Sequence, residues 1–257
     1  MSRILGFSYG LVSYGLFFGA FLYLVGFLAN ALVPKGIDDG TVLPAAVALA
    51  INFGLIALFG LQHSIMARPG FKKRIERFVP ASFERSTFVL ASSLVLIVLL
   101  WQWKPMTQVL WHVEGVAAAL LWVLYACGFL LVLLSTFVID HFDLFGLRQV
   151  TLNLLRRRYT HPPFKVTYFY KFVRHPLYLG FLIAFWSTPQ MTLGRFIFAL
   201  GMTAYILIGV HYEERDLESF LGEEYRRYRD RVPMLVPRPG LVHETVEPPA
   251  GQAPRPV

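Results

Sequence analysis

The sequence predicts an all-α membrane protein, a polytopic bundle of five to six spans that ends in a helical hairpin. Of the 257 residues, 56% are hydrophobic and only 16% are charged, whereas a soluble domain carries roughly 25% charged residues. The charged residues are also clustered, and this leaves uncharged runs long enough to cross a bilayer as helices. Both observations indicate a chain that is surrounded by lipid.

The net charge of +8 does not indicate a nucleic-acid partner. The basic residues lie at the ends of the apolar runs, where the positive-inside rule places them. The single cysteine, Cys127, lies inside an apolar run, so the chain has no second cysteine for a disulfide or a thiolate metal cluster. We expect the lipid bilayer as a partner, with no nucleic acid and no obligate protein partner.

Four apolar runs in the first part of the chain predict complete spans. The first has about 27 residues, against 7–15 for the apolar core of a cleaved signal peptide, so we interpret it as a retained helix. A basic connector at 68–85 repeats its apolar residues at helical spacing, which predicts a helix on the membrane surface. The four predicted spans are 7–33, 44–66, 86–103 and 115–139.

The rest of the chain predicts the hairpin. Segment 177–188 would be about 18 Å long as a helix, short of the ~30 Å hydrocarbon core, and this predicts a partial or tilted span. Thr192 can cap a helix from Leu193 to about His211, and a break at Gly222 precedes a helix that packs against the bundle through Tyr225 and Tyr228. The predicted domain is 1–236, followed by a disordered proline-rich tail, 237–257.

The distribution of basic residues also predicts the orientation. With the N-terminus inside, 21 of the 24 lysines and arginines lie on the inner side. The exceptions are Lys35, Lys104 and Arg195. The positive-inside rule therefore predicts that both termini are cytoplasmic.

Two polar clusters flank the hairpin, at Arg174–Gly180 and Glu213–Asp216. The inner end of a span favours cations, because the helix dipole and the anionic leaflet both attract them. Three carboxylates there are unfavourable unless a cation is bound, and Arg215 neutralises only one. Glu213 and Asp216 share a helix face. The pattern predicts a cradle for a positively charged small molecule; the alternative is a set of interfacial anchors and a charged helix end.

Four histidines stand near predicted inner ends, namely His63, His141, His175 and His211. A metal or haem site is one interpretation of them. No HExxH or similar pattern supports it, so we expect no metal.

The residues Arg174-His175-Pro176-Leu177-Tyr178-Leu179-Gly180 resemble the RHPxYxG motif of the isoprenylcysteine carboxyl methyltransferase and phospholipid methyltransferase superfamily. Glu213 to Tyr228 resembles its EExxL…FGxxYxxY segment, although Leu221 separates Phe220 from Gly222. Segments 60–64 and 141–149 resemble a narrower branch that includes the methanethiol S-methyltransferases and the NnrU-like membrane proteins. Tyr168-Phe169 replaces the Gly-Pro of many carboxyl methyltransferases, which weakens the expectation of a prenylated-peptide substrate.

The resemblance implies S-adenosylmethionine as methyl donor, bound at the cytoplasmic face of the membrane. This agrees with the predicted cradle, because the donor carries a sulfonium and an ammonium group. The motif residues implied to bind the donor are Tyr170, Arg174, His175, Tyr178, Leu179, Gly180, Glu213, Glu214 and Asp216.

The narrower branch implies a small thiol as acceptor, methanethiol, with dimethyl sulfide as product. A free thiol is only a few per cent ionised at neutral pH, so a base would help. Our candidates are His63 and His141, with Asp143 to orient an imidazole and with Gln62 and Arg148 as substrate contacts. Two alternatives are a methyltransferase that acts on a prenylcysteine carboxylate or a phospholipid amine, and a non-catalytic membrane protein of NnrU type.

Overall fold

Five helices of the computed structural model are long and apolar enough to cross a membrane, as predicted. The structure describes residues 2–160 and 166–237, so the predicted tail lies outside them apart from Pro237. The sixth apolar helix, α8 (Pro176–Trp186), is too short to span, as predicted. The five long helices are α1 (Arg3–Ala29), α2 (Ala45–Ala67), α4 (Ala81–Gln102), α5 (Gly115–Ile139) and α9 (Leu193–Leu221).

The last long helix begins where the sequence predicts and ends later. The Thr192 side chain caps α9 by accepting the N–H of Arg195. The helix continues past His211 to Leu221, because the intervening glutamates and arginine are good helix formers and nothing there breaks the hydrogen-bond ladder. It ends at Gly222, whose φ of +60° is readily adopted by glycine. Helix α10 (Glu223–Arg231) follows.

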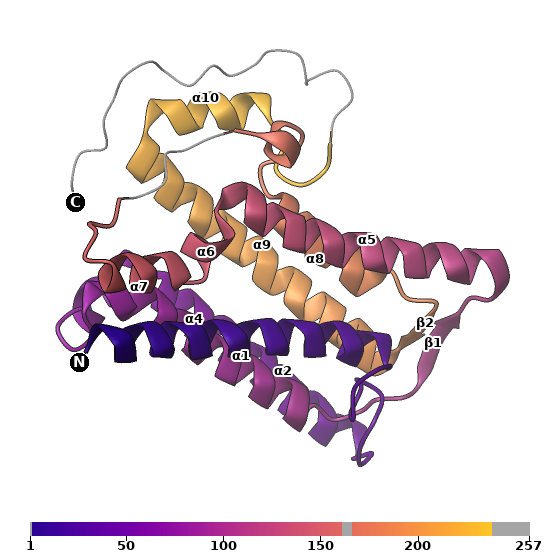
Figure 1. Cartoon of the computed structure of the whole chain (residues 1–257). Helices are drawn as coiled ribbons and strands as arrows, with labels where there is room; N and C mark the ends of the chain where they lie inside the picture. Colours follow the sequence, from indigo (N-terminus) through magenta and orange to yellow (C-terminus); the bar gives the residue numbers. More distant parts are fainter. Residues whose placement is uncertain (1, 161–165, 238–257) are drawn as a thin grey trace.

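Short helices fill the polar connectors. The basic connector forms α3 (Pro69–Ile75), none of whose residues is buried. The long connector forms α6 (His141–Leu144), α7 (Leu147–Leu154) and the 3₁₀ helix η1 (Tyr168–Lys171). These elements lie at the same end of the bundle as the start of α1 and the end of α9 (Figure 1).

The opposite end carries a feature that the sequence did not predict. Strands β1 (Val109–His112) and β2 (Gln190–Thr192) pair antiparallel, and join segments that are far apart in the chain. Beside them the buried Arg195 forms an ion pair with Asp38 at 2.9 Å. We call this pair the outer ion pair. Lys35 reaches the backbone carbonyl oxygens of Trp101 and Trp103, so two of the three basic residues predicted for the outer side have polar partners.

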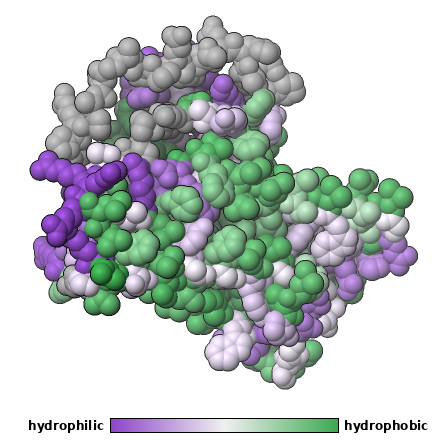
Figure 2. All heavy atoms as spheres, in the orientation of Figure 1, coloured by the Kyte–Doolittle hydropathy of each residue, from purple (hydrophilic) through white to green (hydrophobic). Residues whose placement is uncertain are grey.

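Hydrophilic and hydrophobic side chains occupy different parts of the surface of the bundle. Hydrophilic side chains gather toward the two ends, and the surface between them is largely hydrophobic (Figure 2). Large apolar residues such as Phe53, Leu120 and Leu207 are exposed on the outside of the bundle. A surface of this kind suits lipid rather than water.

Helices α5 and α8 make the closest contact. A Cβ atom on Gly180 would lie 2.6 Å from the carbonyl oxygen of Gly128, and one on Gly128 would lie 2.7 Å from that of Gly180. Two glycines therefore let the backbones touch, as small residues do between membrane helices. This contact fixes the start of the short helix α8 relative to α5.

Candidate functional site

The two polar clusters predicted from the sequence meet in the structure. Arg174, just before α8, donates from Nε to the Oε1 atom of Glu214 on α9 at 2.7 Å. The same oxygen lies 3.1 Å from Nε2 of His175. Arg174 also donates to the carbonyl oxygens of Arg229 and Val232 at 2.8 and 2.6 Å, and so binds the end of α10 to the start of α8.

The three carboxylates that the sequence predicted to form the cradle differ in their partners. Glu214 is neutralised by Arg174 and His175. Asp216 is exposed and pairs with Arg68 of the basic connector at 2.9 Å. Glu213 accepts the hydroxyl of Tyr178 at 2.8 Å. Among the described residues Glu213 alone of the three has no ion-pair partner, so the cradle of three carboxylates is reduced to one.

Three tyrosines, Tyr170, Tyr225 and Tyr228, come from η1 and α10 next to the two motifs. Tyr228 donates its hydroxyl to the carbonyl oxygen of Tyr170 at 2.7 Å. The buried hydroxyl of Tyr225 has no hydrogen-bond partner within the described ranges. Burial, together with nearby charge, raises the pKa of Tyr170, Tyr225 and Tyr228 above the usual 10. All three are therefore neutral hydrogen-bonding groups at neutral pH.

The missing side chain of Gly180 makes room for the backbone of Gly128 and for Val132 of α5. Close helix packing is therefore enough to account for a glycine at this position. The assignment of Gly180 to the donor site stays a prediction. Leu179, the preceding residue, is half-buried and stays a predicted contact.

His141 is held by two hydroxyl groups. Its Nδ1 lies 2.7 Å from Oγ1 of Thr136, and its Nε2 lies 2.8 Å from the hydroxyl of Tyr14. Because Thr136 donates its only proton to the carbonyl oxygen of Leu133, it accepts from Nδ1–H. The Nε2 lone pair then accepts from Tyr14. Burial lowers the pKa of His141 below 6.5, which favours this neutral form.

Asp143 belongs to a different group of side chains. It lies 3.4 Å from Arg148 and accepts the Tyr159 hydroxyl at 3.1 Å. The prediction that Asp143 orients an imidazole is therefore wrong for His141, whose two nitrogens are bonded to Thr136 and Tyr14. Burial and the Asp143 carboxylate raise the pKa of Tyr159 to about 12.

His63 lies in a different environment, among aromatic rings. Its ring centroid is 4.8 Å from that of Phe88, 5.6 Å from Phe59 and 6.2 Å from Tyr205. Its Nδ1 is buried and has no partner among the described residues. The adjacent Gln62 donates to Ser92 at 3.3 Å, and its buried Oε1 also lacks a partner there. The structure therefore places the two candidate bases in separate clusters, and His63 is the one with a nitrogen left open.

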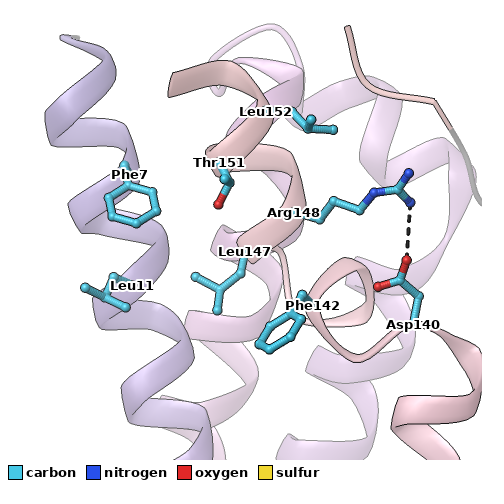
Figure 3. Close-up of a pocket in the computed structure, with 8 residues that line it drawn as sticks. All are labelled: Phe7, Leu11, Asp140, Phe142, Leu147, Arg148, Thr151 and Leu152. Carbon is cyan, nitrogen blue, oxygen red and sulfur yellow. Dashed lines mark hydrogen bonds and ion pairs between the residues drawn. The ribbon is translucent and has the colours of Figure 1, made fainter. Parts of the chain in front are cut away.

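A cavity of about 440 Å³ lies between α1 and the connector helices (Figure 3). Its walls are mostly apolar, and its one ion pair joins Arg148 to Asp140 at 3.3 Å. Arg148, predicted to contact the substrate, lines it. No lining residue comes from α8 or α9, so this cavity is separate from the paired motifs. The lining residues are Phe7, Leu11, Asp140, Phe142, Leu147, Arg148, Thr151 and Leu152.

Within residues 2–160 and 166–237, no three histidines, cysteines or acidic residues lie close enough together to hold a metal ion. Sequence reasoning missed Tyr14, Arg68, Arg85 and Tyr205. Arg85 donates to the carbonyl oxygen of Leu144 at 2.6 Å and lies over the ring of Phe88, 5.1 Å from its centroid. The only sequence signal for Arg68 and Arg85 is that they flank the basic connector.

The fold and the paired motifs define a polytopic membrane protein of a known class. The sequence model described as NnrU protein matches residues 53–237, and the chain belongs to the NnrU family. No solved structure matches the chain.

Within this class the chain belongs with the methanethiol S-methyltransferases. It is 49% identical to methanethiol S-methyltransferase 1 of Bradyrhizobium diazoefficiens, over 91% of this chain and 83% of that protein. It is 48% identical to the methanethiol S-methyltransferase of Mycobacterium tuberculosis, over 93% of this chain and 98% of that protein. The protein of that name from Crocosphaera subtropica is 44% identical, over 92% and 93% of the two chains.

Proposed function

We propose that the protein methylates methanethiol to dimethyl sulfide with S-adenosylmethionine as donor. The observation that carries the proposal is identity of 44–49% to proteins named methanethiol S-methyltransferase over more than nine-tenths of the chain. The meeting of the α8 and α9 motifs supports it, since the two segments that resemble donor-binding motifs come together.

The residues present fit a cationic donor. Glu213 is a half-buried carboxylate with a hydroxyl partner and no ion-pair partner among the described residues. The hydroxyl of Tyr225 has no hydrogen-bond partner among the described residues, and its helix, α10, is held to the start of α8 by Arg174. We assign Glu213, Tyr178 and Tyr170 to the donor, with Arg174, His175 and Glu214 holding the start of α8 in place. The bound donor supplies a methyl group on a positively charged sulfur.

The site can promote the transfer by position and desolvation. Attack of a thiolate on a sulfonium removes two opposite charges, so a dry site favours the reaction more than water does. Holding the two sulfurs in line supplies a further part of the acceleration. In the balanced step the acceptor sulfur forms a bond to the methyl carbon. The bond from that carbon to the donor sulfur breaks, and its electron pair stays on the donor sulfur.

His63 is our proposed base. It takes the thiol proton and later releases this proton to water, which regenerates the neutral imidazole. The observation that favours His63 over His141 is that Nδ1 of His63 has no hydrogen-bond partner among the described residues, whereas both ring nitrogens of His141 are hydrogen-bonded. His141 then serves to hold α6 against α1 and α5.

We also propose that the motif end of the bundle faces the cytoplasm, with residues 1–236 forming one domain in the cytoplasmic membrane. The basic residues gathered at this end support the orientation. Methanethiol is small and apolar, so it can reach the site through the bilayer.

The direct test is detection of dimethyl sulfide in the headspace above purified protein, methanethiol and donor. No product from folded protein would overturn the proposal. If calorimetry then showed donor binding, a prenylcysteine carboxylate or a phospholipid amine would become the acceptor to test. Absence of donor binding would favour a non-catalytic protein of NnrU type.

A further inference from the structure

Tyr205 of α9 is contacted by three residues of one short stretch of α2. A Cβ atom on Gly60 would lie 3.1 Å from its ring. The ring centroid of His63 lies 6.2 Å from that of Tyr205, with the two rings nearly perpendicular, and the ring centroid of Phe59 lies 5.8 Å from it. Residues three and four apart on a helix share a face, so this stretch of α2 presents one face to one side chain.

Tyr205 also closes a set of aromatic rings around His63. Phe59 and Tyr205 lie 5.8 Å apart, and Phe88 packs edge-on to the imidazole from α4. We call Phe59, Phe88 and Tyr205 the aromatic box. The unpartnered Nδ1 of His63 lies inside this apolar environment. Sulfur makes favourable contacts with aromatic rings, so the box suits a small thiol next to a proton acceptor.

The aromatic box is connected to the proposed donor site through α9. Glu213 lies eight residues after Tyr205 on this helix, and so about 12 Å away along the helix axis. Tyr178 of α8 and Tyr205 pack against the same hydrophobic core. Tyr205 therefore lies on the helix that leads from His63 to the proposed donor contacts.

We propose that Tyr205 is the specificity-determining wall of the acceptor site, and that its ring limits the size of thiol that fits between His63 and the donor. This inference rests on the proposed function and deepens it by naming the residue that selects the acceptor. Tyr205 acts through position, and His63 is the group that touches the thiol proton.

Two substitutions should change acceptor preference. Tyr205→Leu removes the ring and opens the box, so kcat/KM for 1-propanethiol relative to methanethiol should rise on the order of tenfold, the scale for methylene discrimination in an apolar pocket. Gly60→Ala would place a methyl group 3.1 Å from the ring, so the ring must shift and the same ratio should change. Gly54→Ala is the matched control on α2, because its Cβ would meet nothing within 4 Å.

The readout separates this role from a structural one. A merely structural change would lower turnover with both thiols equally, so the ratio of the two kcat/KM values would not change. An unchanged ratio in Gly60→Ala would overturn the inference, even if Tyr205→Leu did not fold. Weaker donor binding in both variants, with an unchanged ratio, would move Tyr205 to the donor site. If the unmodified protein methylates no thiol, the proposed function fails first and takes this inference with it.

Discussion

Arg174 and Glu214 lie 2.7 Å apart although 40 residues separate them in the chain. Their side chains are only 10% and 17% exposed, and His175 shares the carboxylate. The pair ties the start of α8 to α9, and we propose that it stabilises the hairpin rather than presenting charge to a ligand. This distinguishes Glu214 from its neighbour Glu213.

Glu214→Ala should destabilise the protein, because it leaves a buried guanidinium without its counter-ion. Breaking such a pair costs on the order of 3 kcal/mol or more. We expect a lower thermal midpoint in detergent, measured by tryptophan fluorescence. An unchanged midpoint would mean that the carbonyl oxygens of Arg229 and Val232 satisfy Arg174 unaided.

Glu213→Gln should weaken donor binding without a comparable loss of stability. A hydrogen bond to a charged group is worth about 1.5–3 kcal/mol, so we expect the dissociation constant to rise roughly tenfold to a hundredfold. Calorimetry with the purified protein measures it. Asp216→Asn is the control on the same helix, since Asp216 is exposed and pairs with Arg68. Equal effects of the two substitutions would contradict the assignment of Glu213.

His63→Gln should lower turnover of methanethiol by on the order of tenfold to a hundredfold at neutral pH, because little thiol ionises without a base. The loss should shrink as the pH rises and the thiol ionises unaided. Dimethyl sulfide production from pH 6 to about 10 measures both effects. A deficit that stays constant over this range would indicate a structural role for His63.

His141 should make stability depend on pH. Burial lowers its folded-state pKa below the unfolded value near 6.5, so the unfolded chain binds the proton more readily. The contribution of neutral His141 is complete above pH 6.5 and is lost as the pH falls from there through the folded-state pKa. Thermal midpoints between pH 7.5 and 5 should fall more steeply for the unmodified protein than for His141→Asn. Parallel slopes would exclude His141 as the source.

Gly180→Ala should destabilise the bundle by about 1–3 kcal/mol, the usual cost of overpacking. The added methyl group would lie 2.6 Å from the Gly128 carbonyl oxygen, so the two helices must separate. Gly209→Ala is the control, because its Cβ meets nothing within 4 Å. Donor affinity per folded molecule should persist in Gly180→Ala, and its selective loss would support Gly180 as a donor contact.

The sequence predicts the spans well because hydropathy and helix length are local properties. The fourth predicted span, 115–139, coincides with α5, and the cap at Thr192 and the break at Gly222 follow from the chemistry of single residues. The strands β1 and β2 escaped prediction, because segments of three or four residues have no periodicity to recognise.

The sequence predicts which motifs form the site, but it does not predict which side chains pair within it. Local sequence identifies the two motifs, but it cannot say which cation each carboxylate meets. Arg68 lies 148 residues from Asp216, and Tyr14 lies 127 residues from His141. Such partners are decided by helix packing, as are the contacts of Gly180 and Tyr205.

The outer ion pair has a kinetic consequence for the proposed reaction. Beside Arg195 and Asp38 the bundle is filled by fully buried rings, including Phe27, Trp103 and Phe198, and this favours entry and exit of the proposed donor at the motif end. Fresh and spent donor would then compete for the same site. Turnover would then follow the cell's ratio of methylated to demethylated donor, while the volatile product leaves through the lipid.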